Sequence, residues 1–173
     1  MKSILKRMTV LLTLLLTVTT LFSCAFGLDK KFSKAGVTIT LTNQFVEKEI
    51  VSQTAYYEST TMIVTVLKEE FTMLSGLENW TLKKYAETTI SGNSLTAEVV
   101  ETENPYVYFE YEKTVSGNDY KYLATCFKAD DAFWLIQFGC FEKNYDKLRS
   151  DMFKYADSVT FDGETVSSET NAA

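Results

Sequence analysis

The sequence has 173 residues, a formal net charge of −6 and no histidine. The lack of histidine excludes Ser-His-Asp and Cys-His nucleophile pairs and the usual imidazole ligands of a metal site. Without residues 1–23 the chain holds 14 basic and 23 acidic residues, a net charge of −9. A domain this acidic, with no basic cluster, is a poor binder of nucleic acid.

Residues 1–23 are predicted to be a signal peptide. Three basic residues, Lys2, Lys6 and Arg7, precede the apolar residues 8–22. This apolar stretch has the length of a secretory signal and is short for a membrane span. The segment therefore directs the rest of the chain out of the cytoplasm.

Two cleavage sites compete at the end of this segment. Residues 21–24 resemble a bacterial lipobox, although Phe22 is bulky for its place, and processing there makes Cys24 a lipidated N-terminus. Residues 25–27 offer an A-x-G site for plain secretion instead. The lipobox is the favoured interpretation, which predicts an extracytoplasmic, membrane-anchored lipoprotein with residues 24–30 as a short linker.

Residues 31–162 are expected to form one domain, followed by a disordered tail at 163–173. Alternating apolar residues and turn signals predict its first strands. These are an edge strand at 30–34, a strand at 37–41, a weaker strand or loop at 46–50, and a hairpin of 55–58 and 62–67 that ends at 68–70.

A loop at 71–80 leads to a predicted helix at 81–90. Its apolar residues recur at helical spacing, and Thr81 can cap the free amides of the first turn. A strand at 95–101 follows. A second helix is predicted at 144–158, with Asn144 as its cap and a buried stripe of Tyr145, Leu148, Met152, Ala156 and Val159.

Between these segments, residues 105–141 are predicted to form an antiparallel meander. Its strands are 106–115, 120–128 and 132–141. Residues 116–119 place Gly-Asn at the centre of the first tight turn, and residues 129–131 make the second. Both faces of the third strand are mostly apolar, so both should be covered. The fold class is therefore α+β, an α/β/α sandwich around an antiparallel sheet.

Cys126 and Cys140 are predicted to be free thiols. In either plausible register Cys126 lies opposite Trp134 or Leu135, and Cys140 opposite Tyr120 or Lys121. The two cysteines are then about 17–20 Å apart at ~3.4 Å per residue, whereas a disulfide needs Cα atoms within about 7 Å.

Candidate binding residues are sparse. Carboxylate pairs that could serve hydrolysis or bind a cation occur at Glu69/Glu70, Glu101/Glu103, Glu110/Glu112 and Asp130/Asp131. No ligand-rich loop accompanies any pair, so a solvated surface explains them better. The candidate ligand-binding aromatics are Tyr56, Tyr57, Trp80, Tyr106 and Tyr108, for which core packing is the competing role. No catalytic residue, metal ligand or cofactor is assigned.

The order of the segments resembles a known family. FSKAGVTITLTNQF, MIVTVLKEEF, TLKKYAETTI, YFEYEKTVSGNDYKYLATCFKADDAFWLIQF and NYDKLRSDMFKYADSVTF together look like the PsbP-like domains of small bacterial lipoproteins. The resemblance covers about residues 32–161 and implies an α/β/α sandwich that acts in binding or assembly. It carries no catalytic signature.

We therefore expect a non-enzymatic, lipid-anchored binding or assembly module outside the cytoplasm. Its expected partners are the membrane, through the lipid on Cys24, and an envelope protein or small ligand. The alternative is a carboxylate-based hydrolase or cation-binding protein that uses one of the acid pairs.

Overall fold

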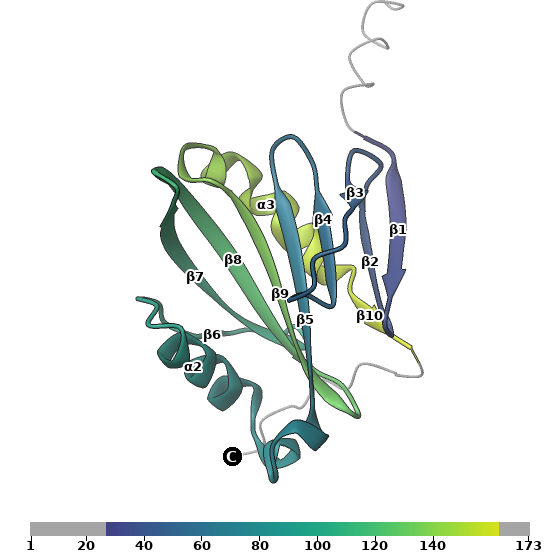
Figure 1. The fold of residues 1–173 in the computed structure, drawn as a ribbon, viewed down its shortest axis with the longest axis vertical. Coiled ribbons are helices and arrows are strands. Elements are labelled where there is room, and N and C mark those ends of the chain that lie inside the picture. The colour runs from purple at the N-terminus through teal and green to yellow at the C-terminus, as the bar shows by residue number, and fades with distance from the viewer. Residues whose placement is uncertain (1–26, 163–173) are drawn as a thin grey trace, which may run out of the picture.

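In the part of the chain that the structure describes, two antiparallel sheets and two α-helices form an α+β fold (Figure 1). The computed structural model describes residues 27–162. The predicted signal peptide, the lipidation site Cys24 and the predicted tail at 163–173 lie outside the described residues.

The large sheet contains the predicted meander, which is confirmed. Its seven strands are ordered β3-β4-β5-β9-β8-β7-β6, and all neighbours are antiparallel. Their bounds are β3 (Val46–Glu47), β4 (Ala55–Glu58), β5 (Ile63–Glu70), β6 (Val100–Glu101), β7 (Tyr106–Val115), β8 (Asn118–Lys128) and β9 (Ala132–Phe141).

The turn between β7 and β8 is one residue away from its predicted centre. Val115 pairs with Asn118, so Ser116 and Gly117 form the two-residue loop. Both have positive φ, 51° and 80°, which matches the right-handed twist of a tight hairpin. The Gly-Asn centre was wrong because glycine can occupy either loop position, and the strand pairing places it second.

The small sheet joins the two ends of the domain. It has the order β1-β2-β10, from β1 (Asp29–Lys34), β2 (Val37–Thr42) and β10 (Thr160–Phe161). Val37, Ile39 and Leu41 point into the core as predicted, each at most 1% exposed. Strand β1 begins at Asp29, one residue before the edge strand predicted at 30–34.

Both predicted helices are present. The first, α2 (Leu82–Gly92), is capped as expected, with the Lys84 N–H donating to Thr81 Oγ1 at 3.2 Å. The second, α3 (Tyr145–Asp157), follows a short 3₁₀ turn at residues 142–144, and the Asn144 side chain makes no capping bond. That cap was wrong because Asn144 is itself helical, so its backbone continues a turn that has already begun. No helix within residues 27–162 is long and apolar enough to span a membrane.

Two further boundaries differ from the sequence prediction. Strand β5 continues through Glu70, because residues 68–70 pair with Trp134, Phe133 and Ala132 of β9. The strand predicted at 95–101 is paired only at Val100 and Glu101. Its alternation still reflects burial, since Leu95, Ala97 and Val99 pack on the core without a neighbouring strand.

The two faces of the large sheet are covered by different layers. On one face α3 and the small sheet bury Trp134, Ile136 and Phe138. On the other face α2 and the segment before it bury Phe133 and Leu135. The predicted covering of both faces of β9 is thus confirmed for residues 132–136. In the second half of the strand the α2 side is only partly covered, and Phe141 there is 39% exposed.

Candidate functional site

The five aromatic residues predicted to bind a ligand do not form one surface. Tyr57 and Tyr106 are buried in the core on the α3 side, and Tyr108 packs there against Phe153 with ring centroids 5.1 Å apart. Tyr56 lies on the opposite side of β4, where side chains alternate. Trp80, just before α2, lies under the ammonium of Lys84 at 4.3 Å.

Tyr106 has a clear structural role. Its hydroxyl donates to Asp157 Oδ1 at 2.7 Å and accepts from the Asn104 amide at 3.2 Å. Burial, followed by the Asp157 contact, raises the pKa of Tyr106 to about 12. This side chain fastens the start of β7 to the end of α3.

Among the described residues, the predicted acid pairs take part in five ion pairs, of which the longest joins Glu70 to Lys68 at 3.7 Å. Ion pairs join Glu110 to Arg149 at 2.7 Å, Glu112 to Lys121 at 3.1 Å, Glu101 to Lys83 at 2.9 Å and Asp131 to Lys68 at 2.7 Å. Within residues 27–162, no three His, Cys, Asp or Glu side chains are grouped to hold a metal ion. This arrangement does not favour the hydrolase or cation-binding alternative.

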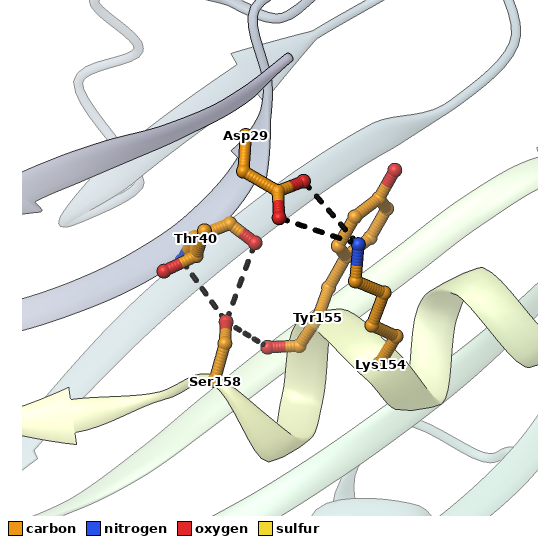
Figure 2. A network of polar contacts seen from close by, with 5 residues as sticks. All are labelled: Asp29, Thr40, Lys154, Tyr155 and Ser158. Carbon is orange, nitrogen blue, oxygen red and sulfur yellow. Dashed lines mark hydrogen bonds and ion pairs between the residues drawn. The ribbon is translucent and has the colours of Figure 1, made fainter. Parts of the chain in front are cut away.

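Two small cavities lie between the layers. One, of about 150 Å³, is bordered by Asp29, Lys154 and Tyr155. Figure 2 shows the polar network beside it, in which Lys154 pairs with Asp29 and Ser158 bonds to the backbone of Thr40. The other, of about 200 Å³, lies at the opposite end beside Lys68 and Trp134. Each is too small for a drug-sized ligand, whose sites measure about 300–1,000 Å³.

A larger surface of a different kind lies on the α2 side of the large sheet. Five aromatic side chains from four strands share this side, and we call them the aromatic face: Tyr56, Tyr111, Tyr120, Tyr122 and Phe141. Tyr111 is buried in the same core cluster as Tyr85 of α2. In Figure 1, α2 lies beside the lower part of β7, and α3 lies beside the upper part of the sheet; the core clusters place the two helices on opposite faces.

Ring contacts connect most of the aromatic face. Tyr111 stacks on Tyr122 with centroids 4.8 Å apart, and Tyr120 stacks on Phe141 at 4.9 Å. Tyr120 and Tyr122 are 6.3 Å apart. Tyr56 reaches the same region, because the pairing register aligns it with Thr65 and then with Gln137. Tyr56, Tyr120 and Tyr122 are partly exposed, and Phe141 is 39% exposed.

Gly139 makes room for this packing. A Cβ atom at Gly139 would lie 2.4 Å from Cε1 of Tyr122, directly across the strand pair. Real Cβ atoms never approach so closely, so any larger residue would displace the ring. Glycine here lets Tyr122 lean over β9 and bring its ring beside the sheet.

Polar groups complete the aromatic face. The Tyr111 hydroxyl donates to Gln137 Oε1, and burial raises the pKa of Tyr111 well above its usual range. Burial, followed by the charge of Glu58, also raises the pKa of Tyr56. The hydroxyls are therefore neutral donors and acceptors near pH 7, and the surface offers apolar rings with fixed polar edges.

Sequence reasoning missed Tyr111, Tyr120, Tyr122 and Phe141 as site residues. Alternation alone gives both halves of these strands the same apolar pattern. A signal existed in the element lengths, because 11 helical residues span about 16 Å at 1.5 Å each, whereas ten strand residues span about 34 Å. A single short helix cannot cover such a strand.

Comparison with known proteins gives structural likeness alone. No family model and no curated protein sequence matches the chain. The solution structure of the cyanobacterial PsbP protein CyanoP from Synechocystis is similar, with a TM-score of 0.55 and 15% identity over 80% of this chain and 95% of that one.

A second solved structure, of a protein from Bacteroides thetaiotaomicron, is similar at a TM-score of 0.52 and 13% identity. It aligns with 78% of this chain, which spans half of that protein's length. At such identities the likeness concerns the backbone arrangement, in agreement with the strand order and layers described above. The chain therefore has a PsbP-like fold.

Proposed function

We propose that this chain is a non-enzymatic binding or assembly module, anchored outside the cytoplasm by lipid on Cys24, and that the aromatic face is its binding surface for an envelope protein. The observation that supports this is a difference in burial between the two sides of the same strands. On β8 and β9, Leu123 and Phe138 on the α3 side are fully buried, while Tyr122 and Phe141 on the α2 side stay partly exposed.

The composition of the aromatic face supports a protein partner. Tyrosine and phenylalanine are enriched at protein interfaces, where they bury large areas and lose little side-chain entropy. Tyrosine hydroxyls can pair with polar groups of a partner after the rings are covered. The resemblance to binding and assembly factors agrees with this role, although fold alone does not transfer a partner.

The chemistry of the remaining polar groups supports a role without catalysis. Glu110 and Glu112 share a face but are each paired with a basic side chain. Tyr111 and Tyr56 have raised pKa values and remain protonated near pH 7, so neither is activated as a nucleophile.

Site-specific photo-crosslinking in cells tests the proposal. A photoreactive phenylalanine analogue at Phe141 should give a covalent adduct with one protein, whereas the same group at Glu87, exposed on α2, should not. Phe141→Ser should leave the melting temperature nearly unchanged because the side chain is already partly in solvent. Equal labelling from both positions, or none from either, would contradict the proposed binding surface.

A further inference from the structure

Strand β7 has an edge that is open over most of its length. Its inner side pairs with β8 from Tyr106 to Val115, but its outer neighbour β6 pairs only with Val107 and Tyr108. No other described strand lies beyond residues 109–115. An unpaired row of backbone N–H and C=O groups is a template for another strand.

The turn identifies which backbone groups are free. A two-residue hairpin loop is closed by a hydrogen-bonded pair, here Val115 and Asn118, and such pairs recur at every second residue. Residues 109, 111, 113 and 115 therefore bond to β8. Glu110, Glu112 and Thr114 direct their N–H and C=O groups outward. Tyr106 fits this alternation, because its C=O faces outward and accepts from Thr102 Oγ1 at 2.8 Å.

The two sides of this edge differ in chemistry. On the α2 side stand Tyr111, which is buried, and the exposed residues Lys113 and Val115, the latter 41% exposed. On the α3 side stand Glu110 and Glu112, with side chains 26% and 60% exposed and with Oε1 of each in an ion pair, to Arg149 and to Lys121. A strand added here would meet Tyr111, Lys113 and Val115 on one side and the two glutamates on the other.

This charge pattern disfavours a second copy of the chain as the added strand. When two copies of one strand pair antiparallel about a two-fold axis, residues directly opposite one another lie on the same face of the sheet. Because side chains alternate between the faces, the two residue numbers are both even or both odd. Every register that uses the middle of the open edge then opposes Glu110 or Glu112 with a glutamate of the other copy, or opposes Lys113 with itself. Like charges directly opposite destabilise a strand pair.

We propose that the partner contributes an extended segment of about five to seven residues, which adds as a strand to the open edge of β7. Lysine or arginine side chains of that segment lie opposite Glu110 and Glu112, and apolar side chains lie beside Tyr111 and Val115. The proposal rests on the proposed function and specifies the kind of partner that the aromatic face receives.

A synthetic heptapeptide tests the proposal. Its residues alternate valine with lysine, its ends are capped, and a matched peptide carries glutamate in place of lysine. Titrated into the full chain in mild detergent, the lysine peptide should slow amide exchange at Glu110, Glu112 and Thr114, as observed by NMR. It should bind at least about tenfold more tightly than the glutamate peptide, because two cross-strand charge pairs change sign.

Two variants at one position separate backbone pairing from charge. Glu112→Pro removes the outward N–H and leaves the bonds to β8 intact, since proline is tolerated where an edge N–H faces solvent. Glu112→Thr removes the same charge but keeps the N–H. Binding of the lysine peptide should be lost in Glu112→Pro and retained, with reduced affinity, in Glu112→Thr, while circular dichroism shows both folded.

Three results would overturn the inference. They are equal affinity in both variants, equal affinity for both peptides, and protection of Glu112 that appears without peptide and grows with protein concentration, which would indicate self-pairing. Failure here is distinguishable from failure of the proposed function. If crosslinking from Phe141 persists at its full level in Glu112→Pro, the chain binds a protein at the aromatic face without strand addition.

Discussion

Trp134 is the largest side chain of the core and is 2% exposed. Its ring lies 5.3 Å from that of Phe161. Its indole N–H has no acceptor among the described residues. Truncation to alanine should lower the free energy of unfolding by about 3–5 kcal/mol, the usual range for a large buried aromatic.

The control is Trp134→Phe. It removes the unpaired indole N–H and keeps an aromatic ring, so its destabilisation should be clearly smaller. Urea unfolding of both variants measures the difference. A Trp134→Ala protein with the wild-type midpoint would show that this side chain lies outside the cooperative core.

Tyr106 makes stability sensitive to alkaline pH. Its pKa is about 12 in the folded chain and about 10 in an unfolded chain. Between these values the unfolded state loses the proton first, so stability is full below about pH 10 and falls as pH rises toward 12. Tyr106→Phe should make the fall of the free energy of unfolding with pH less steep by about 1.4 kcal/mol per pH unit, which is the contribution of one titrating proton. Urea titrations from pH 9 to 11.5 test it, and an unchanged slope would exclude Tyr106 as the titrating group.

At the scale of elements, Ser158 connects α3 to the small sheet. Strand β10 pairs Thr160 with Thr38, so Ser158 comes opposite Thr40, where the ladder has ended. Its hydroxyl oxygen accepts from the Thr40 N–H at 2.9 Å and lies 2.7 Å from the Tyr155 C=O (Figure 2). A side chain thus replaces the missing backbone pair.

Ser158→Ala should therefore destabilise the chain by about 1–1.5 kcal/mol, because it leaves the partly buried Thr40 N–H without its acceptor. Lys154→Ala is the control from the same network, because the Lys154–Asp29 ion pair is largely exposed and such pairs contribute at most about 1 kcal/mol. In thermal unfolding, the melting temperature of Ser158→Ala should be lower than that of Lys154→Ala. The reverse order would show that the ion pair, and not the hydroxyl, joins the two elements.

The register of β8 and β9 decides the state of the cysteines. Cys126 is paired with Leu135 and Cys140 with Lys121, one of the two registers expected from the sequence, and both thiols are free and buried. Burial raises the pKa of Cys140 to about 11 and that of Cys126 further.

Both thiols should react with a thiol reagent at neutral pH only after denaturation, since the thiolate is the reactive form. Mass spectrometry after alkylation without reductant measures this. A disulfide between Cys126 and Cys140 would contradict the register.

The meander could be predicted from the sequence because its information is local. Period-two alternation and turn residues specify β7, β8 and β9, although the β7–β8 turn is centred one residue before the predicted Gly117-Asn118 turn and the register shifts with it. The small sheet could not be assembled in this way, since β2 and β10 pair across more than a hundred residues. The aromatic face escaped prediction because it depends on where α2 stops.

At the scale of the whole molecule, the proposed lipid on Cys24 predicts attachment to the membrane. Strand β1 starts at Asp29, so four residues separate it from Cys24, and the five Cα–Cα steps reach at most about 18 Å. Two acyl chains anchor stably, whereas one binds only marginally. Cys24→Ser should therefore move the protein from the membrane fraction to the soluble fraction with an unchanged melting temperature. Wild-type protein found in the medium with its N-terminus at Leu28 would show that the A-x-G site is used instead.

The pairing of β10 with β2 also sets an order of folding. The hairpins of the meander close over short loops and can form early, whereas Thr160 and Phe161 must find Thr38 and Val37 across nearly the whole domain. If the chain is exported, as proposed, β1 and β2 emerge first, and these two strands must wait until the last part of the domain has crossed. During that interval Val37, Ile39 and Leu41 lack their core neighbours, so a chain stalled before Thr160 would present its first hairpin to chaperones and proteases.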